Sequence, residues 1–273
     1  MSNALLEVTG LSKYFDDVAA VDNVSFTLQP SETLGIVGES GSGKTTLARC
    51  ILRAMDPDEG IVRFNGNNGW CEVQALTESE LVPLRQEMQM VFQDPFSSLN
   101  PRMTVQEILE EPLIIHDIDD KNSRREAVLD ILARVQLDAD ALTRFPHAFS
   151  GGQRQRIGIA RALILRPKLV VCDESVSALD VSVQAQIINL LEDLQEELGL
   201  TYLFVAHDLS VVHHICDRIL VMYRGRVVEE GLVNDVFSNP QEDYTKLLLS
   251  AIPSPDPDVP LKPMDRKSLN LTL

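Results

Sequence analysis

The stretch GESGSGKTT, residues 38–46, decides how the rest of this 273-residue sequence is interpreted. It fits the pattern G-x-x-x-x-G-K-[ST], follows the apolar run TLGIV and precedes the helical run TLARCILRAM. In that context the glycines let backbone amides turn toward phosphate oxygens, and the N-terminus of the following helix adds partial positive charge. The stretch therefore predicts a nucleotide phosphate site, called the phosphate loop below.

Every residue of the phosphate loop is a candidate ligand of the nucleotide. Lys44 is expected to reach the terminal phosphates, and the Thr45 hydroxyl is expected to bind Mg²⁺. The full set is Gly38, Glu39, Ser40, Gly41, Ser42, Gly43, Lys44, Thr45 and Thr46.

A second candidate element is LVVCDE, residues 169–174, a short apolar run typical of a strand buried on both faces. A carboxylate at its end, Asp173, would lie beside the phosphate loop and hold Mg²⁺ through water. The next carboxylate, Glu174, can orient and deprotonate an attacking water. The two elements predict a nucleotide hydrolase. An N-K-x-D guanine-reading motif is absent from the sequence, which argues against a GTPase, and a small-molecule kinase would not need Glu174.

Composition narrows the class of protein. The chain is 44% hydrophobic and 24% charged, as in ordinary globular proteins. Its formal charge of -17 argues against nucleic acid and against adsorption to anionic lipid. No apolar run approaches the roughly 20 residues that span a bilayer, and the N-terminus lacks a signal-peptide pattern. The four cysteines have no metal or disulfide spacing, so we expect reduced thiols in the cytosol.

The order of apolar runs and turns predicts an α/β fold. Strand-like runs precede residue 37, and RILVMYRGRVVEEG is typical of a hairpin turning at Arg224–Gly225. A helix is expected between Asp180 and Gly199. We predict a P-loop NTPase core, a mostly parallel sheet with helices on both faces, together with an antiparallel β subdomain and an inserted α-helical subdomain at about 95–167. The proline-rich tail, 251–273, is expected to be poorly ordered.

The stretch FSGGQRQR, residues 149–156, leads into the apolar helical pattern IGIARALIL. A glycine pair at a helix N-terminus can bind an anion, although it can also be a plain turn. With this stretch, the sequence from about residue 5 to 250 resembles the ATP-binding subunits of ABC transporters, whose hallmark is S-G-G-Q. The order of motifs matches throughout.

The resemblance implies further site residues. Gln93 in VFQDPFSSLNP matches the glutamine that contacts Mg²⁺ and senses the membrane partner, and His207 in LFVAHDLS matches the residue that touches the γ-phosphate. Phe15, or otherwise Tyr14, is expected to stack on adenine. A second group would bind the ATP of another cassette in a head-to-tail dimer: Ser150, Gly151, Gly152, Gln153 and Asp180. Two departures are Phe149 in place of leucine and Ser175 in place of proline.

Longer stretches, such as SALDVSVQAQIINLL and NPQEDYTKLLLSAIPSPDP, resemble the oligopeptide and dipeptide importer branch. The resemblance implies ATP and Mg²⁺ as cofactors, a second cassette and two transmembrane permeases as partners, and an extracytoplasmic solute-binding protein as an indirect partner. It implies a peripheral position on the cytoplasmic face of the inner membrane. No cysteine follows Cys216, so no iron–sulfur cluster is expected. The transported solute and the identity of the second cassette stay open.

Two other functions remain as alternatives to a transporter. Soluble ABC ATPases of DNA repair carry long coiled coils between the two glycine motifs, and those of translation carry two cassettes; this sequence has neither. The other alternative is an accessory ATPase of a soluble enzyme complex, which the sequence does not exclude.

Overall fold

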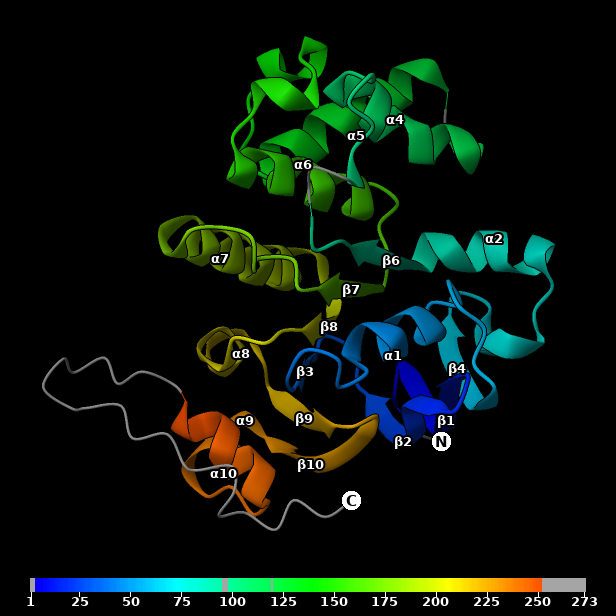
Figure 1. Cartoon of the computed structure of the whole chain (residues 1–273). Helices are drawn as coiled ribbons and strands as arrows, with labels where there is room; N and C mark the ends of the chain where they lie inside the picture. The colour runs from blue at the N-terminus through cyan, green and yellow to red at the C-terminus, as the bar shows by residue number, and fades with distance from the viewer. Residues whose placement is uncertain (1–2, 95–97, 119, 252–273) are drawn as a thin grey trace, which may run out of the picture.

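The computed structural model describes residues 3–94, 98–118 and 120–251. Four antiparallel strands form a small sheet in the order β2-β1-β4-β5. They are β1 (Leu6–Phe15), β2 (Val18–Leu28), β4 (Glu59–Gly66) and β5 (Gly69–Glu72). This sheet lies at the lower right of Figure 1, next to α1 (Lys44–Ile51).

A larger, six-stranded sheet forms the centre of the molecule in the order β10-β9-β3-β8-β7-β6. All of its neighbouring strands run parallel except β10, which pairs antiparallel with β9. The strands are β3 (Thr33–Val37), β6 (Met88–Val91), β7 (Leu169–Asp173), β8 (Thr201–Val205), β9 (Arg218–Tyr223) and β10 (Arg226–Leu232). The sheet therefore has the mostly parallel arrangement that was predicted.

The central strands are buried on both faces because alternate side chains enter two different cores. Tyr202 and Phe204 of β8 pack in one core with α7 (Val181–Leu198) and α8 (Leu209–Ile215). Leu203 and Val205 pack in the other core with α1 and the small sheet. Since side chains alternate across a strand, a continuous apolar run fills both cores. The predicted α/β class is confirmed.

Between β6 and β7 the described residues form helices and turns, which make the upper layer of Figure 1. The helices are α4 (Val105–Ile115), α5 (Lys121–Arg134) and α6 (Gly151–Leu163), with 3₁₀ turns at Ala139–Thr143 and Pro146–Ala148. Capping residues set two of the starts: Thr104 exchanges hydrogen bonds with Glu107, and Ser150 does so with Gln153. Local sequence thus positions the glycine pair at the first turn of α6.

The remaining elements lie at the edges of the core. They are a 3₁₀ turn at Val73–Ala75, α2 (Glu78–Glu87), α9 (Val233–Ser238) and α10 (Asp243–Ser250). The hairpin turns at Arg224–Gly225 as expected, and Gly199 ends α7 in the left-handed conformation. Within the described residues no helix is both long and apolar enough to cross a bilayer. Most of the predicted tail, 252–273, lies outside the described residues.

Candidate functional site

The phosphate loop connects β3 to α1 through a tight backbone path. Gly38 has a φ of 150°, and a Cβ there would lie 2.2 Å from the carbonyl oxygen of Met222. A Cβ on Gly43 would lie 2.0 Å from the carbonyl oxygen of Ala20. Neither place accepts a side chain, because real Cβ atoms do not approach backbone oxygens so closely. The loop is therefore enclosed by β2 on one side and β9 on the other.

Lys44 lies almost completely buried at the start of α1, with 4% of its surface exposed. Its ammonium donates hydrogen bonds to the carbonyl oxygens of Gly38 and Glu39, both at 2.9 Å. Burial lowers the pKa of Lys44, and the carboxylates of Glu174 and Asp173 oppose that shift. The Ser42 hydroxyl is buried nearby and has no hydrogen-bond partner among the described residues. A buried ammonium bonded only to carbonyls and an unpartnered hydroxyl fit an anionic ligand such as phosphate.

Thr45 and Asp173 meet beside the loop although they are far apart in sequence. The Thr45 hydroxyl donates to Oδ1 of Asp173 at 2.9 Å. Burial raises the pKa of Asp173, while the Thr45 hydrogen bond, Arg49 and Lys44 lower it. A hydroxyl and a carboxylate at this distance are oxygen ligands of the kind that Mg²⁺ prefers, so these residues fit the ion. Among the described residues no group of three or more His, Cys, Asp and Glu side chains forms a metal site. The absence of an iron–sulfur cluster stays a prediction.

Glu174 follows Asp173 in a left-handed turn, with a φ of 47°. Its Oε2 accepts a hydrogen bond from the Gln93 amide at 2.7 Å and lies 3.5 Å from Nδ1 of His207. The Glu174 N–H donates to the carbonyl of Val205, which ties the turn to β8. The structure thus brings together three predicted catalytic side chains from three separate segments.

The glycine motif forms the N-terminus of α6, and Figure 1 places this helix in the upper layer, across β6 and β7 from the phosphate loop. A Cβ on Gly152 would lie 2.4 Å from Cγ1 of Val183, so α6 and α7 approach closely here. Asp180 caps α7 by accepting from the Val183 N–H, and hydrogen bonds from Ser182 and then Val183 lower its pKa. These motif residues therefore have local structural roles of their own.

Four further residues were singled out in the sequence: Phe15, Tyr14, Phe149 and Ser175. Phe15 is 46% exposed and Tyr14 39% exposed at the end of β1, so neither ring belongs to the core. Phe149, the first departure, is buried under the guanidinium of Arg144. Ser175, the second departure, is buried just after Glu174. The exposed rings are free to stack on a planar group.

One residue near the site was missed by the sequence reasoning. Arg49 on α1 lies close enough to Asp173 to lower the pKa of that carboxyl. It is four residues after Thr45, and residues at that spacing share a helix face. Helical spacing from the predicted Mg²⁺ ligand could have indicated it.

Comparison with known proteins identifies the family. Residues 21–177, more than half of the chain, match the family model described as ABC transporter. The chain belongs to the ABC transporter family. It is 50% identical over 263 residues to the oligopeptide transport ATP-binding protein OppF of Bacillus subtilis, covering 94% of this chain and 85% of that protein. It is 51% identical over 261 residues to the oligopeptide transport ATP-binding protein AppF of the same organism, with coverages of 91% and 78%.

Solved ABC structures share the fold. One is cbiO1 from Clostridium perfringens, part of the ABC transporter complex cbiONQ, with a TM-score of 0.77 and 28% identity; the match covers 87% of this chain and 92% of that one. Another is an ATP-binding cassette solved as a dimer in a post-hydrolysis state bound to ADP and Pi, with a TM-score of 0.73 and 31% identity over 84% and 98% of the two chains. The predicted resemblance to the ATP-binding subunits of ABC transporters is confirmed, as are the P-loop NTPase fold and the role as an ATPase subunit.

Proposed function

We propose that this ABC subunit hydrolyses ATP at the phosphate loop to energise the import of peptides or a related small solute. The observation that carries the proposal is the convergence of Thr45, Asp173 and Glu174 beside one buried lysine, Lys44. The similarity to two oligopeptide transport ATP-binding proteins supports peptides as the solute class. The accessory role in a soluble enzyme complex is not favoured by these relatives.

Each side chain of the cluster has a role that its position supports. Lys44 would keep its two carbonyl partners and donate its third ammonium N–H to the terminal phosphates of ATP, and the Phe15 ring would stack on the adenine. Thr45 and Asp173, with Gln93, would hold Mg²⁺, which supplies positive charge for the phosphate oxygens when bound. Glu174 would accept a proton from the attacking water, and His207 would contact the γ-phosphate.

The hydrogen bond from Gln93 to Glu174 bears on this mechanism. It occupies one carboxylate oxygen of the proposed base at 2.7 Å. An ionised carboxylate has about four lone-pair sites on its two oxygens, so Glu174 can accept a proton from water while Gln93 stays bonded to Oε2. The Gln93 amide therefore helps to orient the base in our proposal.

The second half of the site is proposed to come from another cassette. The first turn of α6, with Ser150 to Gln153, presents helix N–H groups at a distance from the phosphate loop of its own chain. Such an N-terminus favours an anion. The similarity to a cassette solved as a dimer supports a head-to-tail pair in which these residues and Asp180 face the partner's ATP. The partner is a second copy or a homologous cassette.

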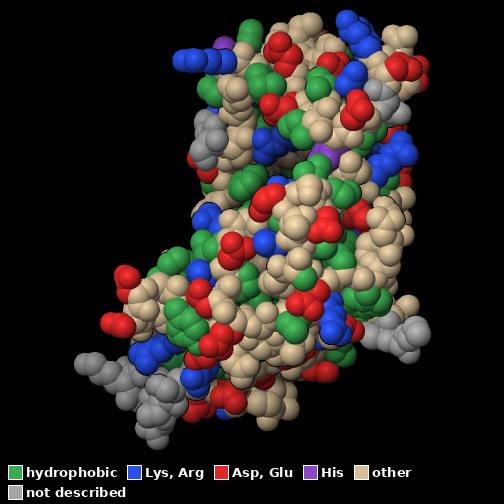
Figure 2. Space-filling model, turned by 90° about the vertical axis from the view of Figure 1, so that its right-hand side faces the viewer, with side chains coloured by type: hydrophobic (Ala, Val, Ile, Leu, Met, Phe, Trp, Pro, Cys, Tyr) green, Lys and Arg blue, Asp and Glu red, His purple; other side chains and the backbone are tan. Residues whose placement is uncertain are grey.

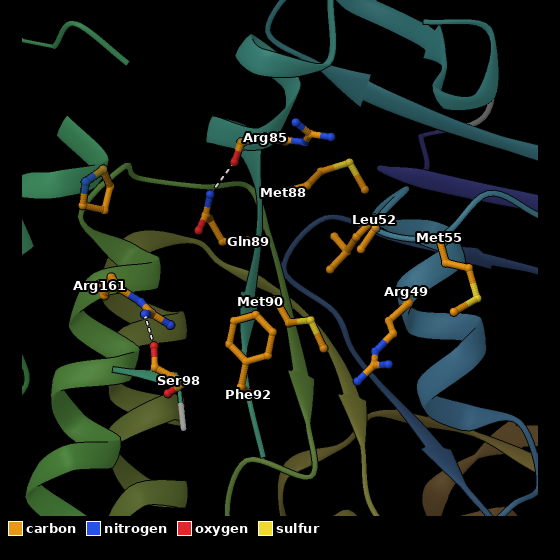
Figure 3. A pocket seen from close by; sticks show the side chains of 12 residues that line it. Arg49, Leu52, Met55, Arg85, Met88, Gln89, Met90, Phe92, Ser98 and Arg161 are labelled. Carbon is orange, nitrogen blue, oxygen red and sulfur yellow. Dashed lines mark hydrogen bonds between the residues drawn. The ribbon is translucent and has the colours of Figure 1, made fainter. Parts of the chain in front are cut away.

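The surface for the membrane partner is a groove of about 840 Å³ between the helical layer and the core, called the docking groove here. Figure 3 shows its lining, with α1 on one side and α6 on the other, and Figure 2 shows the hollowed face of the molecule. Its apolar lining includes Leu52, Met55, Met88, Met90, Phe92 and Pro112. Methionine side chains adapt to the shape of a partner, so this lining suits an apolar helix face.

The charge of the docking groove indicates the chemistry of that partner. Arg49, Arg85 and Arg161 line it, and none of its described lining residues is acidic. This is a basic place in a chain with a net charge of -17. We propose that it receives a cytoplasmic helix of a permease with apolar side chains and at least one carboxylate. The peripheral position on the cytoplasmic membrane face and the indirect solute-binding protein follow from that partner.

Two charge-reversal variants test the docking groove. Arg85→Glu should reduce the permease that co-purifies with the tagged chain from solubilised membranes, because it repels an acidic helix. Arg125→Glu, on the exposed side of α5, makes the same charge change away from the groove and should have no effect. Equal retention of the permease in both variants would exclude the groove as its binding site.

The domain organisation is part of the proposal. We propose one cassette over residues 5–250 with an inserted helical subdomain at about 95–167. The helices α4, α5 and α6 in the upper layer of Figure 1 support that division.

The proposed base is tested by Glu174→Gln. This variant keeps the shape of the side chain and removes the proton acceptor, so ATP turnover of the purified chain should fall about 100-fold or more. ATP binding should remain, and size-exclusion chromatography with MgATP should show a longer-lived dimer. Glu196→Gln, an exposed residue of α7, is the matched control and should keep full turnover. Unchanged turnover in Glu174→Gln would remove Glu174 from the mechanism.

A further inference from the structure

The C-terminal helix α10 reaches the phosphate loop through one side chain, Tyr244. Its hydroxyl accepts a hydrogen bond from the backbone N–H of Glu39 at 3.0 Å, across 205 positions of sequence. Only 2% of Tyr244 is exposed. Buried hydroxyl and amide groups are nearly always hydrogen-bonded in folded proteins, because an unpaired buried polar group is costly. The Tyr244 bond is therefore part of the structure that holds the phosphate loop in place.

Several contacts hold α10 in the place from which Tyr244 makes this bond. The Tyr244 ring packs on Tyr223 of β9, with ring centroids 4.3 Å apart. The Glu229 carboxylate of β10 accepts the N–H groups of Gln241 and Glu242, at 2.8 and 3.1 Å, at the start of the helix. Figure 1 shows α10 beside the β9–β10 hairpin. The helix is thus fastened to a hairpin whose strand β9 also borders the phosphate loop.

The peptide between Gly38 and Glu39 is held from both sides. Its N–H donates to Tyr244, and its carbonyl oxygen, that of Gly38, accepts from the Lys44 ammonium at 2.9 Å. In a trans peptide these two groups point in opposite directions, so a partner for one sets the direction of the other. Glycine offers little resistance to rotation of this peptide. Tyr244 therefore determines where the carbonyl that binds Lys44 points.

We propose that Tyr244 is a positioning residue of the nucleotide site, which orients the Gly38–Glu39 peptide and through it Lys44. The proposal rests on the proposed binding of ATP phosphates by the phosphate loop. In this proposal the C-terminal helix α10 supports the nucleotide site through Tyr244.

The test compares two tyrosine variants that each lose one buried hydroxyl. Tyr244→Phe keeps the ring and removes the acceptor for the Glu39 N–H. Tyr202→Phe removes a buried hydrogen bond of 3.0 Å to the Leu191 carbonyl, in the core, and serves as the control. Titration of the full chain with a fluorescent ATP analogue and Mg²⁺ gives the affinity. We expect Tyr244→Phe to bind about fivefold more weakly, which is about 1 kcal/mol, and Tyr202→Phe to bind like the wild type.

Two more readouts separate positioning from a general loss of stability. The KM for ATP should rise in Tyr244→Phe while kcat stays within about twofold, and amide hydrogen exchange should quicken around Glu39. Glu229→Gln, which weakens the hold on α10 and keeps the tyrosine, should raise the KM in the same direction. If Tyr244→Phe folds poorly, the KM for ATP of Glu229→Gln tests the positioning role in its place.

The outcomes are distinguishable. Equal ATP affinity and equal exchange at Glu39 in Tyr244→Phe and Tyr202→Phe would overturn the positioning role. A wild-type chain that binds no ATP analogue would instead refute the proposed nucleotide site itself.

Discussion

The contact between α6 and α7 allows a quantitative prediction at Gly152. A Cβ at this position would lie 2.4 Å from Cγ1 of Val183. Carbon atoms prefer a separation of about 3.5–4.0 Å, so Gly152→Ala creates an overlap of roughly 1 Å. Val183 is β-branched and lies in a helix, where its χ1 is largely restricted to one rotamer, so it cannot turn away. The two helices must separate or distort.

The sign of the stability change depends on two opposing terms. Overpacking a helix contact costs about 1–3 kcal/mol, whereas alanine gains about 1 kcal/mol over glycine in a helix. We expect Gly152→Ala to lower the free energy of unfolding by about 1 kcal/mol, which lowers the Tm by about 2–4 °C in a protein of this size. Without the overlap the same substitution would be stabilising.

A double-mutant cycle with Val183→Ala isolates the overlap. Val183→Ala alone should destabilise by losing methyl contacts, and together with Gly152→Ala it should relieve the clash. Urea unfolding of the four proteins should give a coupling energy of at least about 1 kcal/mol. Additive effects, or a Gly152→Ala variant more stable than the wild type, would refute the packing explanation.

Two further predictions concern groups whose pKa is shifted by burial. Burial raises the pKa of Cys50 to about 11 and leaves its side chain unexposed, whereas Cys71 is partly exposed. Iodoacetamide at pH 8 should therefore label Cys71 before Cys50, which mass spectrometry can show. Equal labelling rates at the two cysteines would contradict this prediction. Burial also raises the pKa of Asp173 above 3.8, so the folded protein binds that proton more tightly than the unfolded chain does. The stability gained from this tighter proton binding is fully present below pH 3.8, and it is lost as the pH rises through the pKa of Asp173 in the folded protein. The free energy of unfolding of the wild type should fall relative to that of Asp173→Asn across this window in urea titrations, and a pH-independent difference would refute the assignment.

Much of the fold was predictable because its signals are local. The phosphate loop, the end of α7 at Gly199 and the hairpin at Arg224–Gly225 depend on residues within a few positions of each other. The β4, β5 and α2 segment between residues 59 and 87 was not indicated. β4 buries only two of its apolar side chains, Val62 and Phe64, and β5 has only four residues. The helix α2 contains Pro83, which weakens the helical pattern.

The site was only partly predictable for a related reason. The sequence identified Asp173 as a carboxylate at the end of a buried strand, and the resemblance to ABC subunits identified Gln93 and His207. It did not show that β8 lies between β3 and β7, so that Thr45 reaches Asp173 across an intervening strand. Nor did it show that Gln93 bonds directly to Glu174. Strand order is set by the packing of the whole sheet, so short sequence motifs do not predict it.

The sequence by itself determined that a glycine loop joins β3 to α1 and where several helices begin, because both depend on backbone geometry over a few residues. Only the tertiary structure decided what surrounds that loop. Tyr244 reaches Glu39 from 205 positions away, and three arginines gather in the docking groove from α1, α2 and α6. Such contacts arise when separate elements bury their apolar faces against the same core, so their partners are set by packing and not by spacing along the chain.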